Sequence, residues 1–243
     1  MLVQSGAGRT PLLWEYRQHG PLPIFLLVLT FVTGLVDAVS YFKLGHVFVA
    51  NMTGNLVFLG FAVADAADFS VSASLVAICA FLIGAVAGGR LGQAAGQHRG
   101  RYLAYAAFFK IALIGAAFAL SLAPIDPRGG LFSYSLITLL AAAMGLQNAS
   151  ARRLGVPDLT TTVLTLTLTG LAADSALAGG SNAYVARRLV ATVTMLAGAV
   201  VGAFMIIHAG LSASLALALA LQVANGIGAS RLLSSSESWT GSS

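Results

Sequence analysis

Charged residues are scarce in this chain of 243 residues, because Asp, Glu, Lys and Arg together make up only 9% of it. A soluble domain averages about 25% charged residues and needs them to cover a surface that faces water. Apolar residues make up 58% of the chain, and its mean hydropathy is +0.87. This composition excludes an ordinary soluble domain and predicts an all-α membrane protein whose helices cross the bilayer several times.

The motifs of common catalytic and cofactor sites are also missing. The sequence has no G-x-x-x-x-G-K-[ST] loop, no H-E-x-x-H, and no Cys/His cluster with metal-ligand spacing. Cys79 is the single cysteine, which excludes an internal disulfide. We therefore expect no enzyme, no ATP-driven pump, no metal and no cofactor.

The net charge of +5 does not indicate a nucleic-acid partner. The basic residues stand singly or in pairs at the ends of apolar runs, as in the cytoplasmic loops of membrane proteins. They are not interleaved with aromatic residues, as they would be on a nucleic-acid surface. The lipid bilayer is the partner that this pattern predicts.

Eight apolar segments follow one another along the chain, each close to the length of about 20 residues that a spanning helix needs. They are 22–41, 47–64, 71–89, 102–123, 131–149, 159–177, 189–208 and 211–229. Together they predict one transmembrane domain, 22–229. Residues 1–21 are polar and lack the apolar core of a signal peptide, so we expect a cytoplasmic segment there. The serine-rich residues 230–243 are expected to be a disordered tail.

The distribution of basic residues separates two topologies. If all eight segments span, six basic loop residues fall on each side, which is no bias. If the second and sixth segments enter and leave on the same side, only Lys43 and Arg128 fall outside. The other ten then fall inside: Arg9, Arg17, Arg90, Arg99, Arg101, Arg152, Arg153, Arg187, Arg188 and Arg231. This favours six spanning helices plus two re-entrant or half-membrane segments, with both termini cytoplasmic.

The chain also matches itself at a shift of about 111 residues. "GLVDAVSYFKLG" (34–45) aligns with "GLQNASARRLG" (145–155), and "IGAVAG" (83–88) aligns with "AGAVVG" (197–202). Repeat one covers about 22–124 and repeat two about 131–229. Each repeat holds three spans under the favoured topology, so the second would be inverted in the bilayer, as in many transporters.

The same motifs resemble a known family. "GLVDAVSYFKLGHVFVANMTGN" (34–55), "MGLQNASARRLG" (144–155) and the threonine-rich run after it are similar to the YoaK-like family of bacterial inner-membrane proteins. The resemblance covers about 22–229 and implies a multi-pass protein of the bacterial plasma membrane. It supplies no activity, because that family is one of unknown function. Leu166 stands where the family's second-half motif has a glycine, which puts strict symmetry of the halves in doubt.

Polar residues at bilayer depth are the candidates for a transport pathway. An aspartate within a span, such as Asp37, is costly and marks a functional site by default; the alternative is a structural ion pair or an interfacial position. Asn51, Thr53 and Asn55 alternate around Gly54 and would share one side of an extended or broken segment. Hydrogen bonding between neighbouring helices is the alternative for them.

The second repeat offers matching residues. Asn148 aligns with Asp37, Gln147 stands beside it, and Thr165 aligns with Thr53 in a run that also includes Thr161. We predict a pathway lined by Asp37, Asn51, Thr53, Asn55, Gln147, Asn148, Thr161 and Thr165. The threonines could instead bond to their own helix backbone.

Three further residues are candidates for accessory roles. Tyr41 lies on the face of Asp37, and His46 stands at the start of the second segment. Lys110 is expected to snorkel to the cytoplasmic interface, with a place in the pathway as the alternative. Small residues at a spacing of four let helices pack closely, so Gly84, Gly88, Gly198 and Gly202 are assigned to helix packing.

The function that these features predict is a small secondary transporter or channel-like permease. A small polar solute or ion would pass between the two repeats, while Asp37 selects charge or couples transport. The alternative is a membrane scaffold or envelope sensor that transports nothing and uses the same polar residues to pack helices. Association into an oligomer stays open.

Overall fold

The computed structural model of this chain describes residues 19–66, 68–125, 130–159, 161, 164–180 and 184–241. These residues form helices and loops, with no strand among them. Six helices are long and apolar enough to cross a membrane: α2 (Leu22–Lys43), α4 (Val71–Ala94), α5 (Arg99–Ser121), α6 (Gly130–Leu154), α8 (Val185–His208) and α9 (Gly210–Ser230). The prediction of an all-α membrane protein is confirmed.

Two shorter apolar helices stand where the second and sixth segments were expected. The first, α3 (Met52–Val63), has 12 residues, which makes it about 18 Å long. The second, α7 (Leu164–Ala173), has 10 residues and is about 15 Å long. A bilayer core is about 30 Å thick, so neither helix is long enough to span it.

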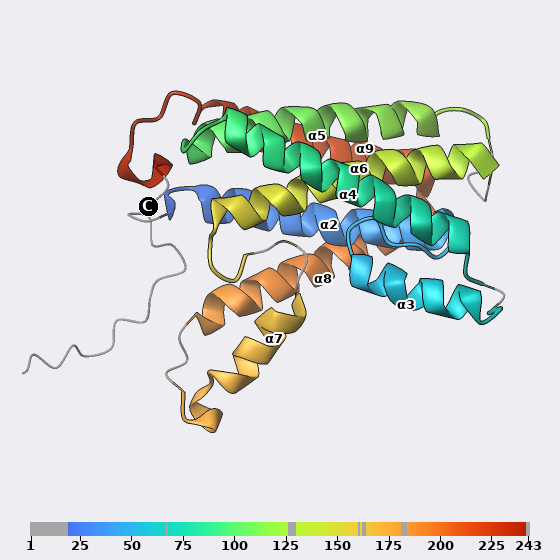
Figure 1. Cartoon of the computed structure of the whole chain (residues 1–243), viewed down its shortest axis with the longest axis horizontal. Coiled ribbons are helices and arrows are strands. Elements are labelled where there is room, and N and C mark those ends of the chain that lie inside the picture. The colour runs from blue at the N-terminus through green and yellow to red at the C-terminus, as the bar shows by residue number, and fades with distance from the viewer. Residues whose placement is uncertain are drawn as a thin grey trace, which may run out of the picture.

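The helices form one elongated bundle (Figure 1). α2 and α6 are its most buried helices; α4 and α5 pack against α6, while α8 and α9 pack against α2. α3 lies along α4, and α7 lies along α8. In Figure 1, α3 runs from the middle of the bundle toward one end, and α7 runs toward the other.

The outer helices turn large apolar side chains outward, as lipid contact requires. Ile83 of α4, Phe108 of α5 and Ile207 of α8 are each more than 60% exposed. In water such a surface would be an aggregation hazard. In a bilayer it is the surface that meets the acyl chains.

Two pairs of glycines set the closest helix approaches. Gly84 and Gly145 bring α4 against α6, where a Cβ on either would collide with a backbone carbonyl oxygen of the other helix. Gly34 and Gly198 do the same for α2 and α8. One turn beyond Gly84 and Gly198, Gly88 and Gly202 continue the two contacts. The four glycines assigned to packing all lie at these approaches.

The described arginines lie together at one end of the bundle. The starts of α2, α5 and α8 and the ends of α4, α6 and α9 all lie there (Figure 1). This arginine-rich end carries the eight described members of the inside set: Arg90, Arg99, Arg101, Arg152, Arg153, Arg187, Arg188 and Arg231. Lys43 closes α2 at the opposite end, as the six-span topology predicts. Arg9, Arg17 and Arg128 lie outside the described residues.

The tail differs from its prediction. Residues 231–241 are not disordered but fold back over the arginine-rich end, where Trp239 is 3% exposed and packs in a cluster with Leu22 and Leu103. His98 Nε2 lies 2.9 Å from the carbonyl oxygen of Ser235. The tail has a serine-rich composition, but the burial of one large aromatic ring outweighs it.

Candidate functional site

A cavity of about 560 Å³ lies where α3 and α7 begin, and we refer to it as the central cavity. Its lining comes from both halves of the chain: Ala50, Asn51, Met52, Thr53, Gly54, Val57, Phe81, Asn148, Leu164, Thr165 and Met195. None of these side chains is charged. The cavity therefore offers amides, hydroxyls and the N-terminal turns of two helices to whatever enters it.

Four of the eight predicted pathway residues meet at this cavity. They are Asn51 and Thr53 from the first half, and Asn148 and Thr165 from the second. Asn51 is the N-cap of α3, and its side-chain oxygen accepts from Gly54 N at 3.4 Å. Asn148 reaches the cavity from α6 and donates its Nδ2 to the carbonyl oxygen of Met144 at 3.0 Å.

Asn51, Thr53 and Asn55 were predicted to share one side of an extended or broken segment, and this is wrong for Asn55. The capping by Asn51 starts a helix at Met52, so Thr53 and Asn55 are helical residues about 200° apart around its axis. Thr53 therefore faces the cavity, while Asn55 is fully buried on the other side. Asn55 Oδ1 accepts from Phe48 N at 2.8 Å, and its Nδ2 donates to Phe48 O at 2.6 Å.

Asp37 does not line the central cavity. It is 5% exposed, and its Oδ1 accepts from Val49 N at 2.9 Å and from Ala50 N at 2.8 Å. These two bonds hold the non-helical segment 44–51 against α2. Asn55 holds the same segment from α3, so Asp37 and Asn55 both fix the wall of the cavity from behind.

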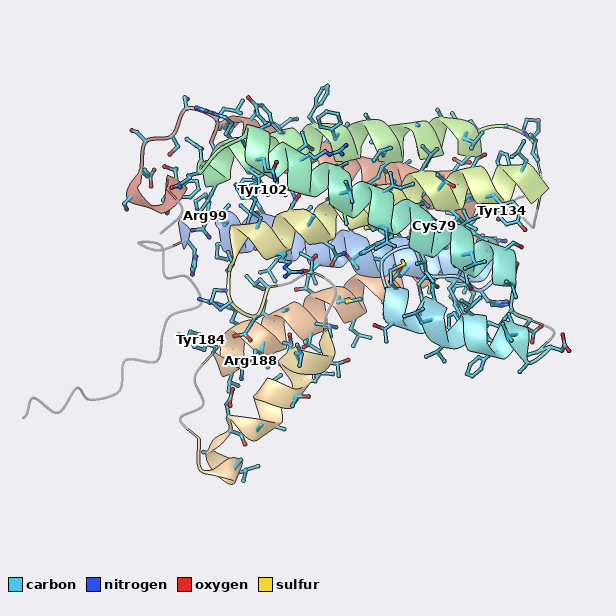
Figure 2. The ribbon with its side chains drawn as sticks, in the orientation of Figure 1. Cys79, Arg99, Tyr102, Tyr134, Tyr184 and Arg188 are labelled. Carbon is cyan, nitrogen blue, oxygen red and sulfur yellow. The ribbon has the colours of Figure 1, made fainter. Side chains whose placement is uncertain are left out.

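In the second half, an arginine fixes the short helix. Arg188 Nε lies 3.0 Å from Asp158 Oδ1, in the segment before α7, and Nη1 lies 2.7 Å from Asp174 Oδ2, just after α7 (Figure 2). The guanidinium fork thus joins both ends of α7 to the start of α8.

Tyr41 and His46 lie in an aromatic cluster beside α3 and do not line the central cavity. Tyr41 stacks on Phe48 with ring centroids 5.5 Å apart, and Phe48 stacks on Phe58 at 5.3 Å. The His46 ring is 5.0 Å from that of Tyr41, and its Nδ1 lies 3.0 Å from the carbonyl oxygen of Asp68. These contacts join segment 44–51 to the middle of α3 and to the loop that follows it.

Gln147 belongs to a second polar site, the Lys110 cluster, formed by Lys110 of α5, Gln147 of α6 and Gln222 of α9. Lys110 Nζ donates to Gln147 Oε1 at 2.5 Å and to Gln222 Oε1 at 2.9 Å. Lys110 is 1% exposed. The expectation that it snorkels is wrong, since it is the middle residue of α5, about 16 Å from either end.

Thr161 is placed separately from the other candidates. It is 3% exposed, and its backbone has a φ of 64°, which is unusual for a β-branched residue. Its hydroxyl has no hydrogen-bond partner among the described residues. It is not part of the cavity lining.

Gln222 and Asn225 of α9 were not predicted as site residues. Both are buried, stand three residues apart, and so share one face of an apolar helix. Gln222 also stands 112 residues after Lys110, close to the shift of the internal repeat. The shared face could have identified both residues, and the repeat spacing could have identified Gln222. No group of three or more His, Cys, Asp or Glu that could hold a metal ion occurs in the part of the chain that the structure describes.

Comparisons with known proteins give a family but no activity. The family model described as "Protein of unknown function (DUF1275)" matches residues 25–227. The UPF0700 transmembrane protein YoaK of Bacillus subtilis (strain 168) is 34% identical over 154 residues, which are 61% of this chain and 65% of that protein. The match thus covers less than two thirds of that relative. No solved structure matches.

Proposed function

The chain belongs to the DUF1275 family of proteins of unknown function, and we propose that it is a small-solute permease whose pathway runs through the central cavity. The observation that carries this proposal is the meeting of Asn51, Thr53, Asn148 and Thr165 around one cavity of about 560 Å³. A protein whose polar residues only pack helices would fill such a space. Here the polar groups surround an open volume instead.

The proposed pathway lies between two inverted halves, α2–α5 and α6–α9. The helix contacts support this, because α4 packs on α6 as α8 packs on α2, and α5 packs on α6 as α9 packs on α2. α3 accompanies α4 as α7 accompanies α8. The opposite directions of α3 and α7 in Figure 1 also fit an inverted repeat.

In this proposal α3 and α7 are half-membrane helices that meet near the midplane. The non-helical segments 44–51 before α3 and 155–159 before α7 would lead the chain back into the bilayer. Each short helix would then run outward to the side from which the chain came. Non-helical backbone at that depth is tolerated only where it is buried in protein or lines a cavity. The hydrogen bonds of Asp37 and Asn55 to segment 44–51 meet this condition for the first half.

The lining favours a small polar solute or a small ion. It supplies amides and hydroxyls that can replace water around a solute, and no fixed charge opposes either sign. Broken helices in transporters use their N-terminal turns in the same way. We place the protein in the plasma membrane of a bacterium, with both termini cytoplasmic and lipid around its outer helices. Association into an oligomer is compatible with this arrangement.

Flux through liposomes tests the proposal. The purified full chain is reconstituted and challenged with glycerol, urea, small amino acids and monovalent salts, while stopped-flow light scattering or ion electrodes follow entry. We expect at least one of these probes to enter faster than in empty liposomes. Thr165→Trp would place a large ring in the cavity and should lower that rate at least tenfold, whereas Leu166→Trp, on a residue that is 73% exposed, should not.

The competing hypothesis is a scaffold or sensor that transports nothing. It predicts that no probe enters faster than in empty liposomes and that Thr165→Trp changes only stability. That pair of results would overturn the permease proposal.

A further inference from the structure

We propose that Lys110 is a proton-exchanging site at mid-membrane, where the Gln222 amide and one water molecule stabilise both its ammonium and its amine form. Proton binding there does not depend on whether the chain carries a solute. If the permease proposal is also right, the site names the proton as the coupling ion.

Lys110 is isolated from other charged side chains. The six long helices contain one carboxylate, Asp37, whose Oδ1 is occupied by the amides of Val49 and Ala50. The other titratable side chains on α5 and on the helices that pack against it are Arg99, Arg101, Tyr102 and Tyr105 of α5, Tyr134, Arg152 and Arg153 of α6, and Cys79 and Arg90 of α4. α9 has none, and none of those named lines the cavity beside Lys110. A lysine buried without a counter-ion in a span is a functional feature by default.

The two glutamines of the Lys110 cluster differ in how firmly their side-chain amides are held. Gln147 has a fixed orientation, because its Nε2 donates to Thr33 Oγ1 at 2.7 Å and to Leu29 O at 3.2 Å. The Nε2 of Gln222 is buried and has no partner among the described residues. Gln222 can therefore rotate its amide by half a turn without breaking any other bond of that side chain.

This rotation would let Gln222 serve both forms of the lysine. An ammonium has three donors and no acceptor, so it needs the amide oxygen. A neutral amine has a lone pair, which can accept from the Nε2 of the rotated amide. When the proton leaves, the Nζ–H bond breaks, its electron pair stays on Nζ, and the proton passes to water.

A small cavity of about 10 Å³ lies beside Lys110, and its lining includes Gln222 and Asn225. That volume is about the smallest that holds a water molecule. Asn225 Oδ1 is buried without a partner among the described residues, while its Nδ2 donates to Phe25 O at 3.2 Å. A water can accept from Lys110 and donate to Asn225 Oδ1. An anion such as chloride could accept from Lys110 but would leave the Asn225 oxygen unsatisfied, so water fits these groups better.

A proton could reach Lys110 from the arginine-rich end of the bundle. A second cavity of about 250 Å³ there is lined by Arg99, Tyr102, Arg153 and Leu154 among others. Figure 2 labels Arg99 and Tyr102 at this end of the bundle. The lining of the small cavity beside Lys110 starts close to this second cavity. It includes Leu103, the residue after Tyr102 in α5, and Ser150, which stands one turn before Arg153 in α6. Both cavities thus lie between α5 and α6, and a proton would pass Tyr102 and Ser150 on its way to Lys110.

Nitrogen NMR of the lysines tests the inference directly. Lys43 and Lys110 are the two lysines of the chain, so 15Nζ labelling of the full chain in lipid bilayers gives two signals. Lys43→Arg leaves the Lys110 signal alone and assigns it. We expect that signal to move reversibly between ammonium and amine positions between about pH 5 and about pH 10. The Gln222 side-chain signal should move with the same midpoint.

A lysine that stays in one form over this range would overturn the inference, as would a Gln222 signal that does not follow Lys110. Gln222→Glu supplies a paired carboxylate and should hold Lys110 as ammonium throughout, with no change at Lys43. These readouts involve no solute flux. A failure here leaves the permease proposal standing, and an absence of flux in liposomes does not affect this result.

Discussion

Asp37 Oδ1 and the backbone amide of Ala50 are joined by a hydrogen bond of 2.8 Å, and the same oxygen accepts from Val49 N at 2.9 Å. Ala50 lines the central cavity, and Asn51, the next residue, caps α3. Asp37 on α2 thus determines where segment 44–51 lies and, through it, where the first short helix begins. Its effect on the cavity is exerted through backbone amides.

The first prediction concerns this contact. Asp37→Ala should lower the free energy of unfolding by about 2–6 kcal/mol, because two buried amides are left unsatisfied at about 1–3 kcal/mol each. Asp37→Asn keeps an acceptor of the same shape and should lose less than half as much. Unfolding by mixed detergent, followed by circular dichroism, measures both. Asp68→Ala, at an exposed loop residue, is the control. Equal losses for the Ala and Asn variants would show that the negative charge, not the acceptor, is what matters.

The second prediction concerns the helix approaches. Gly84→Ala places a methyl group against the carbonyl oxygen of Ala142 and should destabilise the protein by about 1–3 kcal/mol through overpacking. Gly89, five residues along the same helix, has nothing within 4 Å of an added Cβ. Gly89→Ala should be neutral or gain up to about 1 kcal/mol of helix propensity.

Thermal unfolding in detergent compares these two alanine variants. Gly198→Ala, on the α8 side of the equivalent approach, should behave like Gly84→Ala because it meets the carbonyl oxygen of Phe31. Equal melting temperatures for Gly84→Ala and Gly89→Ala would contradict a close backbone contact between α4 and α6 at Gly84.

The long helices could be predicted from the sequence because each needs only a run of about 20 apolar residues. The prediction placed their starts at 22, 71, 131 and 211, and α2, α4, α6 and α9 begin within one residue of those positions. The two short helices were harder, because apolar content does not tell a helix from an apolar loop. Val47 and Val49 are as apolar as any helix residue, yet they precede Asn51, whose side chain caps α3.

The candidate site could be predicted less fully, since composition identifies polar residues but not their partners. Gln147 and Asn148 are neighbours, but they point about 100° apart around α6. Gln147 therefore joins the Lys110 cluster and Asn148 reaches the central cavity. Asp37 was predicted to act on a solute, yet its Oδ1 accepts from two backbone amides that stand 12 and 13 residues further along the chain. No periodicity in the sequence reports such a contact.

The third prediction concerns the tail. Trp239 is 3% exposed against the start of α2 and the N-terminal part of α5. Removing a large buried aromatic ring costs about 3–5 kcal/mol of stability. A short terminal segment that loses this much binding free energy should no longer stay docked on the bundle. Trp239→Ala should therefore release residues 231–241 while the bundle stays folded. Limited proteolysis should then cut the tail several times faster, whereas Leu233→Ala, at a residue that is 37% exposed, should leave the rate unchanged. Equal rates for both variants would mean that the ring does not hold the tail.

The fourth prediction separates half-membrane helices from spanning ones. With Cys79 replaced by alanine, single cysteines are placed at Asp65, just after α3, and at Leu177, a fully exposed residue beyond α7. Half-membrane helices put these positions on opposite faces of the membrane. An impermeant maleimide applied to intact cells should label Asp65→Cys at once and Leu177→Cys only after permeabilisation.

If α3 and α7 crossed the bilayer, both positions would be cytoplasmic and neither would react in intact cells. Crossing would require helices of 12 and 10 residues to bridge a core about 30 Å thick. That would leave at least about 12 Å of non-helical backbone facing lipid, at several kcal/mol for each unsatisfied polar group. The labelling experiment therefore tests the physical constraint on which the proposed midplane position of the central cavity depends.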